Sequence, residues 1–302
     1  MKKIKSIKKS LIPLFGCLFA LTGCSGISIL PGRPLRIQGE SVITPVHLEG
    51  VSSWAQGPRP YTSDLDEATR AALETLWLQD ARGEHASIPA FSRISWQLAA
   101  IGAPSELLEW AHKAALEEIN HARICFALAE GYGERSYFVQ PIPEMLQGGL
   151  DLANDPIKII TTETIFDGCL MEGFFASVAS IAATQCEEPA THAALKQIAY
   201  EEKSHTDFSW AVLEWLLEQH PTKVKVIIQN AYSDIVNYDR PHAVSREQKS
   251  LVEKANPKLL IKHGRLPDEQ WQKIWDDHLR KTQQNLQALL NRQSKLLLDS
   301  PS

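Results

Sequence analysis

The chain has 302 residues, of which 44% are apolar and 22% charged, and its formal net charge at pH 7 is −5. This length and apolar content allow a substantial buried core and favour one main domain with appendages over two equal domains. The acidic balance argues against nucleic acid as a partner, because binding to phosphates needs a surplus of Lys and Arg.

The first 23 residues have the layout of a signal peptide. Five lysines between positions 2 and 9 precede an apolar run from Leu11 to Leu21, which is too short to span a bilayer. Removal of residues 1–23 would leave 26 Lys and Arg against 36 Asp and Glu, a net charge of −10. The processed chain would therefore be still less suited to bind nucleic acid.

The signal segment ends in Gly23-Cys24, and residues 21–24 resemble the lipobox of bacterial lipoproteins. The resemblance implies that cleavage leaves Cys24 as a lipid-bearing N-terminus that anchors the chain in the membrane of a bacterial cell envelope. An uncleaved anchor or an ordinary secreted protein would leave the Gly-Cys pair unexplained. Ser25, rather than Asp, after the cysteine favours the outer membrane, with the protein facing the periplasm or the surface.

Three cysteines remain beyond the signal segment and the lipid site, namely Cys125, Cys169 and Cys186. An odd number without close spacing does not indicate a disulfide framework. Cys125 shares a helix face with His121, four residues earlier, and we expect it to fill core space.

Residues 24–62 are rich in Gly, Pro and Ser and contain short alternating pieces such as 41–46. They predict a tether or a small strand appendage. A first helix is expected from residue 63 to about 101, with acidic residues in its first turn and Gly102 just past its end. Pro89 lies inside this helix and would free the carbonyl of His85, so we expect a kink there.

A second helix is expected over about 104–129, ended by the Gly-Tyr-Gly segment 131–133. A loop with Pro141 and Pro143 follows, and it is long enough to cross from one end of a helical bundle to the other.

A third helix is expected from Asp155-Pro156, a cap followed by proline at the first helical position, to about residue 184. After a short turn at 187–189, a fourth helix runs to about 219. Short, long and short connections predict an all-α protein whose residues 63–220 form a four-helix bundle with one long crossover.

Residues 221–302 hold a middle helical piece and a longer helix that opens near 266–269. We expect this C-terminal helical extension to pack on the outside of the bundle or on a partner.

Two Glu-x-x-His tetrads are the main chemical feature, Glu118 to His121 and Glu202 to His205. Residues three apart lie on one face of a helix, so each carboxylate and imidazole can bind one ion. A candidate partner lies roughly one helix upstream of each tetrad, at Glu84 and at Glu172. The two halves of the bundle therefore resemble one helix pair that is repeated.

Small and apolar residues accompany all these glutamates on their helix faces, so the four carboxylates would meet in the core. Two divalent cations would bring a charge of +4 against the −4 of the carboxylates and would remove the cost of burying these carboxylates. The alternative is that these residues are ordinary surface Glu and His, as a single tetrad would suggest. The repeated pattern favours a dimetal site.

Several alternatives stay open around this site. Glu163 competes with Glu172, but residues nine apart point to opposite sides of a helix, and the apolar neighbours favour Glu172. Glu117 and Glu201 are either partly exposed or hydrogen-bonded to the ligands. The imidazoles need acceptors for their other N–H groups, and His85 and Asp167 are further candidates for this role.

At these positions the chain resembles the ferritin-like di-iron carboxylate superfamily, in which two helices give one Glu each and two give Glu-x-x-His. Residues 83–88 (Gly-Glu-His-Ala-Ser-Ile), 118–123 and 168–172 look most like a group of uncharacterised bacterial ferritin-like lipoproteins, over most of residues 31–220. Pro89 and the C-terminal extension depart from that pattern. The resemblance implies two iron ions, with manganese as the alternative, bridged by Glu118 and Glu202, and the six implied ligands are Glu84, Glu118, His121, Glu172, Glu202 and His205.

The resemblance further implies redox chemistry with O2 or peroxide, as an oxidase or oxygenase acting on an unknown small molecule. No catalytic residues are expected beyond the metal ligands. A closed iron-storage cage suits a lipid-tethered chain with a long extension poorly, so iron oxidation and storage rank lower. The competing class is a non-catalytic envelope lipoprotein that binds metal or serves as a structural or interaction module.

Overall fold

The computed structural model describes residues 32–37, 40–147 and 155–299, and this part of the chain is mostly helical, as the sequence predicts. The signal peptide and Cys24 lie outside the described residues. Short antiparallel strands form two small sheets: β1 (Leu35–Ile37) pairs with β2 (Glu40–Val42), and β3 (Val46–His47) pairs with β4 (Phe138–Val139).

The first long helices, α1 (Glu67–Ala100) and α2 (Ser105–Gly133), lie side by side along most of their length. Asp66 caps α1 by accepting a hydrogen bond from the Thr69 amide at 2.9 Å. Helix α1 continues through Pro89 without interruption. Gly102, at φ +76°, makes the tight turn into α2.

A long connection crosses from α2 to the second pair of helices and carries β4 and the short α3 (Glu144–Gln147). The second pair consists of a composite rod, α4 (Pro156–Glu163), η1 (Thr164–Glu172) and α5 (Gly173–Gln185), packed against α6 (Pro189–Gln219). The α2 and α6 helices are in contact, so the two pairs enclose a common core.

The segment η1 is a π-helix, whereas the sequence predicts an ordinary helix from 155 to about 184. Gly168 lies within this segment and Gly173 directly follows it, and an added Cβ would meet Ser209 at the first and His278 at the second. These glycines let α6 and the C-terminal helix approach the rod closely. The His278 imidazole lies 3.3 Å from the carbonyl oxygen of Cys169. π-helical turns are rare and often occur at functional sites, and this one ends at Glu172.

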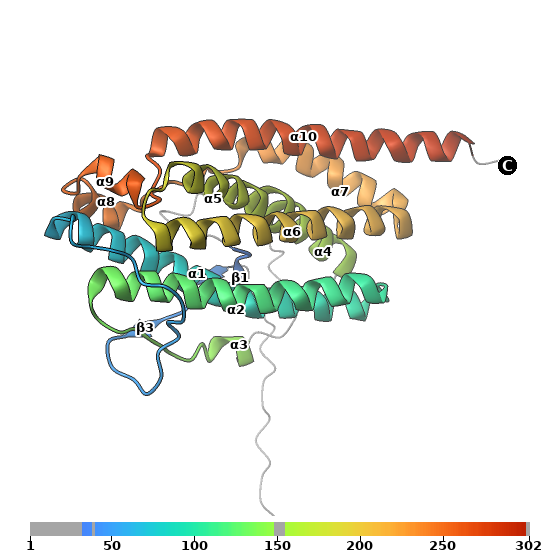
Figure 1. Cartoon of the computed structure of the whole chain (residues 1–302). Coiled ribbons are helices and arrows are strands. Elements are labelled where there is room, and N and C mark those ends of the chain that lie inside the picture. The colour runs from blue at the N-terminus through green and yellow to red at the C-terminus, as the bar shows by residue number, and fades with distance from the viewer. Residues whose placement is uncertain (1–31, 38–39, 148–154, 300–302) are drawn as a thin grey trace, which may run out of the picture.

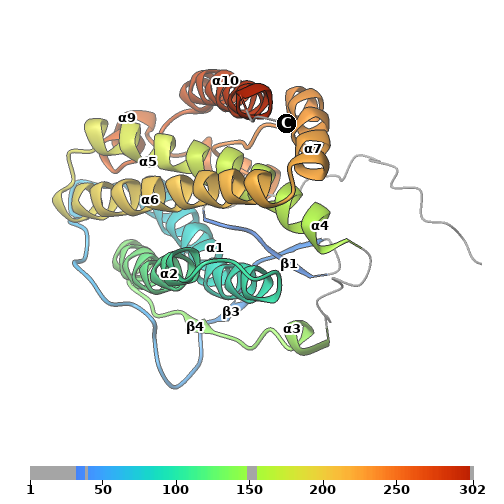
Figure 2. The ribbon, with the colours of Figure 1, turned by 90° about the vertical axis from the view of Figure 1, so that its right-hand side faces the viewer.

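The C-terminal extension contains α7 (Pro221–Asp234), the 3-10 turn η2 (Ile235–Asn237), α8 (Arg246–Val252), α9 (Pro257–Lys262) and α10 (Asp268–Asp299). Helix α10 packs on α5 and α7, while α8 and α9 contact α1. Figures 1 and 2 show the pair α1–α2, the pair α5–α6 and the pair α7–α10 as successive layers. The extension thus packs on the outside of the long helices.

The run Pro156–Gln185 is long and apolar enough to cross a membrane, but 78% of its most apolar window is buried inside the protein. It also carries the buried Asp167 and Glu172. Both features fit the central helix of a packed core.

The C-terminal extension shares the core of the long helices through Trp275 of α10. Trp275 is 4% exposed, and its ring packs edge-on against that of Phe174 with ring centroids 5.2 Å apart. We expect Trp275→Ala to lower the free energy of unfolding by about 3–5 kcal/mol, because it leaves a large cavity. The control is Trp96→Ala. Because Trp96 is 54% exposed, this substitution should change the free energy of unfolding by less than about 0.5 kcal/mol. Equal effects of both substitutions in chemical denaturation would contradict the shared core.

Candidate metal centre

The structure brings all six predicted ligand residues into one buried cluster. Helix α1 contributes Glu84, η1 ends at Glu172, and α2 and α6 each contribute one Glu-x-x-His tetrad. Each of the six residues is at most 1% exposed. The rival carboxylate Glu163 lies outside the cluster and pairs with Arg93 at 3.2 Å.

Half of the cluster is arranged around the imidazole of His121. Its Nδ1 atom lies 3.7 Å from Glu84 Oε2, 3.7 Å from Glu118 Oε2 and 3.4 Å from Glu202 Oε1. The candidate ligand atoms of these four residues all lie within 4.8 Å of one another. This group could hold a metal ion.

The other half is arranged around His205, whose Nδ1 atom lies 3.3 Å from Glu118 Oε1 and 3.6 Å from Glu202 Oε1. The two imidazole rings are 5.8 Å apart. Glu118 and Glu202 therefore each lie beside both imidazoles, between the two halves.

The outer nitrogen of each imidazole lies beside the carboxylate of the residue that directly precedes the other tetrad. His121 Nε2 lies 2.7 Å from Glu201 Oε2, and His205 Nε2 lies 3.0 Å from Glu117 Oε2. When each Nε2–H donates to its carboxylate, the Nδ1 lone pair faces the cluster, which is the tautomer a metal ligand needs. Of the two roles left open for Glu117 and Glu201, the structure shows hydrogen bonding to the histidines.

The expectation that His85 or Asp167 accepts these hydrogen bonds is wrong, because the N-terminal segment engages both side chains. His85 Nδ1 lies 2.9 Å from the Thr44 hydroxyl, and Asp167 forms two hydrogen bonds with Arg36, at 2.6 and 2.9 Å.

Unpaired polar atoms converge inside the cluster. Buried side-chain atoms without a hydrogen-bond partner include both oxygens of Glu118, both oxygens of Glu202, one oxygen each of Glu84 and Glu172, and Nδ1 of both histidines. Buried polar groups are normally satisfied, and an unpaired buried carboxylate is costly. These atoms are the ones that metal ions would bind, so the residues present fit a metal centre.

Without a cation the cluster must retain protons. Burial raises the pKa of Glu84 well above its usual value and that of Glu172 to about 8. Burial would also raise the pKa of Glu118, but the neighbouring imidazoles of His121 and His205 hold that pKa well below its usual range. Burial opposes charge on the histidines too, yet the surrounding carboxylates raise both imidazole pKa values well above 6.5. Metal ions would take the place of these protons.

Arg33 is a member of this site that the sequence does not indicate. Its guanidinium is buried, with Nη1 3.6 Å from Glu172 Oε2 and 3.5 Å from the Ser209 hydroxyl, and it lies over the Phe91 ring at 5.5 Å. Gly32 makes this approach possible, because a Cβ there would meet Ser87 and lie 3.1 Å from Glu84 Oε2. Its φ of +79° also favours glycine.

Arg33 makes the two halves of the cluster electrostatically unequal. It offsets one of the four buried carboxylates, at Glu172, and leaves a formal charge of −3 for metal ions to balance. One divalent cation would leave a net charge of −1 at the site, and two would leave +1. The half around Glu84 and His121 should therefore bind the first ion, and the half around Glu172 and His205 a weaker second one.

Comparison of the sequence with models of known protein families and with curated proteins gave no match. The role of the cluster is therefore argued from its geometry and charge.

We expect Arg33→Met to tighten binding of a second divalent ion at least about tenfold, because it removes a buried like charge. Arg33→Lys, which keeps the charge, is the matched control and should bind the second ion as weakly as the wild type. Titration with Mn²⁺, with free ion followed by electron paramagnetic resonance, measures both sites. Equal behaviour of the Met and Lys variants would contradict this role for the Arg33 charge.

Proposed function

We propose that this chain is an envelope-anchored, ferritin-like protein that binds a dinuclear metal centre, with iron as the preferred metal, for O2- or peroxide-dependent redox chemistry on a small molecule. The observation that supports this most strongly is the convergence of unpaired carboxylate oxygens and imidazole Nδ1 atoms in the buried core.

The ferritin-like part of the proposal is supported by the order and packing of the long helices. The pair α1–α2 and the pair formed by the α4–η1–α5 rod and α6 are each joined by a short turn, and a long connection links the pairs. Two helical segments supply single glutamates and two supply Glu-x-x-His, as in ferritin-like di-metal proteins.

In this proposal Glu84, Glu118, His121 and Glu202 hold one ion, and Glu118, Glu202, His205 and Glu172 hold the other. The electrons for the reduction of O2 or peroxide would come from ferrous iron held by these residues. Glu117 and Glu201 fix the tautomer and orientation of the imidazoles through Nε2. Carboxylate and imidazole ligands also suit manganese, which is the alternative metal.

Apolar side chains pack against the His205 side of the centre and exclude water there. The Phe91 ring lies 4.9 Å from the His205 ring and 6.3 Å from that of Phe208, and both phenylalanines are fully buried. A dry site strengthens each charge interaction and protects reactive species from solvent.

A second candidate is favoured by Arg33. Because that cation disfavours the second ion, the chain could hold a single structural metal and act without redox turnover, as a metal-binding or interaction module of the envelope. Binding of two ions and consumption of O2 distinguish the redox protein from this alternative.

The ligand assignment predicts that Glu118→Ala and His205→Ala lose bound metal while their helices persist. The loss should exceed the roughly 10–100-fold drop in affinity typical of removing a hydrogen-bond partner of a ligand. Metal content by elemental analysis and helicity by circular dichroism measure the two effects. Glu163→Ala, at the carboxylate outside the cluster, is the control and should keep its metal. Unchanged metal content in both ligand variants would refute the assignment.

We propose further that Cys24 carries the lipid that anchors the protein, in the outer membrane by resemblance to bacterial lipoproteins. Cys24→Ala should yield a larger, unprocessed form or a soluble form, because the acceptor thiol is gone. Partitioning between membrane and soluble fractions, with the mass of the product, tests this. Cys17→Ala, in the same signal segment, is the control. Membrane partitioning and mass that match the wild type in the Cys24 variant would reject the anchor.

A further inference from the structure

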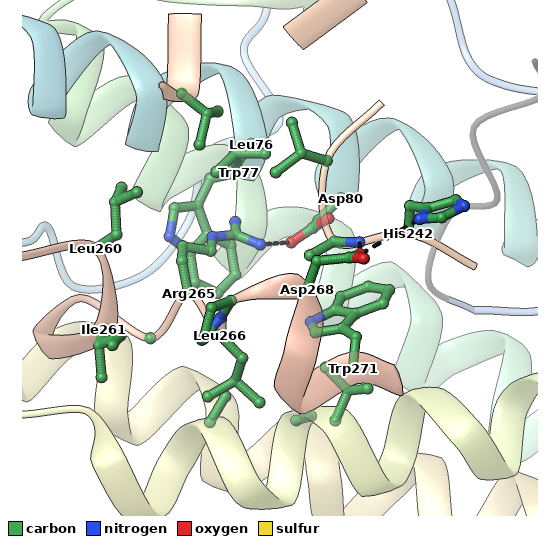
Figure 3. Close-up of a pocket in the computed structure, with 18 of the residues that line it drawn as sticks. Leu76, Trp77, Asp80, His242, Leu260, Ile261, Arg265, Leu266, Asp268 and Trp271 are labelled. Atoms are coloured by element: carbon green, nitrogen blue, oxygen red, sulfur yellow. Dashed lines mark hydrogen bonds and ion pairs between the residues drawn. The ribbon is translucent and has the colours of Figure 1, made fainter. Parts of the chain in front are cut away.

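A cavity of about 620 Å³ lies where the C-terminal extension passes over the long helices. Figure 3 shows its lining residues converging from both sides. The wall on the long helices is mainly apolar and includes Leu76 and Trp77 of α1, Phe175 of α5, and Leu195 and Ile198 of α6.

The extension forms the opposite wall. Leu260 and Ile261 come from α9, Leu266 from the turn that follows, and Trp271 from α10. Gly264, at φ +79°, lies in that turn, and its missing side chain lets the backbone rest against Leu195 of α6. The cavity is therefore enclosed by the extension, and its volume falls in the range of small-molecule binding sites, about 300–1,000 Å³.

The cavity connects the surface with the metal centre. Its lining includes Glu84 and Glu202, whose side chains are 2% exposed, together with the buried Cys125. It also includes Lys249 and Glu253, whose side chains are 72% and 64% exposed. A molecule in this cavity would have one end near solvent and the other beside two of the candidate ligands.

The charges in the lining disfavour an anionic occupant, and its mainly apolar walls favour an uncharged one. Lys249 lies 3.9 Å from Glu253, and Arg265 lies 2.6 Å from Asp80 while stacking over Trp77. Nε and Nη2 of Arg265 have no hydrogen-bond partner among the described residues and are available to a neutral polar group of a ligand. The lining carboxylates outside the metal centre, which also include Asp268 and Glu269, outnumber these two cations, and a charged ligand would lose its hydration against the apolar walls.

We infer that this cavity is a ligand chamber that holds an uncharged, apolar organic molecule beside the metal centre, with the C-terminal extension as its outer wall. The inference deepens the proposed function and depends on it only for the metal at the inner end. It assigns a role to the part of the C-terminal extension between residues 242 and 271 and identifies the substrate class as hydrophobic and neutral.

Binding of 1-decanol and of decanoate to the purified full-length protein, measured by calorimetry, tests the chamber. We expect decanol to bind and decanoate, with the same chain length and one negative charge, to bind at least about tenfold more weakly. Ala179→Phe fills the chamber from α5 and should weaken decanol binding at least about tenfold. Ile261→Trp fills the chamber from α9. Because Ile261 is partly exposed, this second variant serves if Ala179→Phe does not fold. Ala100→Phe, at the exposed end of α1, is the control and should bind decanol like the wild type.

The position of the ligand relative to the metal is tested on the same samples. Decanol protons should relax faster with protein loaded with paramagnetic Mn²⁺ than with Zn²⁺, and metal content is measured in parallel. If the protein takes up no metal but still binds decanol, the proposed function is refuted and the ligand chamber is retained. Bound metal with no decanol binding, or decanol binding that neither filling variant weakens, would overturn the chamber. Decanoate binding as tight as that of decanol would overturn the neutral substrate class.

Discussion

The buried negative charge of Glu84, Glu118, Glu172 and Glu202 is the constraint on which the rest of this structure depends. Isolated carboxylates in a protein interior cost on the order of several kcal/mol each, so the four helical segments that carry them can meet only if that charge is offset. Protons shared with His121 and His205 can do this in part, as the pKa shifts show. Together with Arg33, divalent cations would offset the rest and would also use the unpaired atoms of the cluster.

The same constraint explains features at a distance from the cluster. The crossed contacts of His121 with Glu201 and of His205 with Glu117 tie α2 to α6 at the level of the site. The N-terminal segment brings Arg33 into the core beside Glu172, and Arg36 pairs with Asp167 on the same rod. On the other side, the C-terminal extension covers the helices and leaves a mainly apolar cavity that reaches Glu84 and Glu202. Both ends of the chain therefore contribute to the surroundings of one centre.

The features of the fold and of the site that the sequence predicts are those that depend on residues close together in the chain. Helix periodicity and caps placed the long helices and put Glu and His on common faces, because those signals lie within a few residues of one another. The π-helical segment is not predictable, because nothing in the local pattern of 164–172 distinguishes it from an α-helix. The role of Arg33 is not predictable either, because its partners, Glu172 and Ser209, lie far along the chain. The sequence does not decide which side chains bind the outer nitrogens of the histidines, because that choice depends on how α2 packs against α6 and on how the N-terminal segment engages His85 and Asp167.

The most direct test of the central claim is the metal content of the wild-type protein, measured by elemental analysis after anaerobic loading with ferrous iron and desalting. Close to two irons per chain is the result expected for the dinuclear centre. One iron per chain would limit the site to the half around Glu84 and His121 and would favour the structural alternative. Neither iron nor manganese bound would contradict the metal centre and would leave the buried carboxylates to be balanced by protons and Arg33 alone.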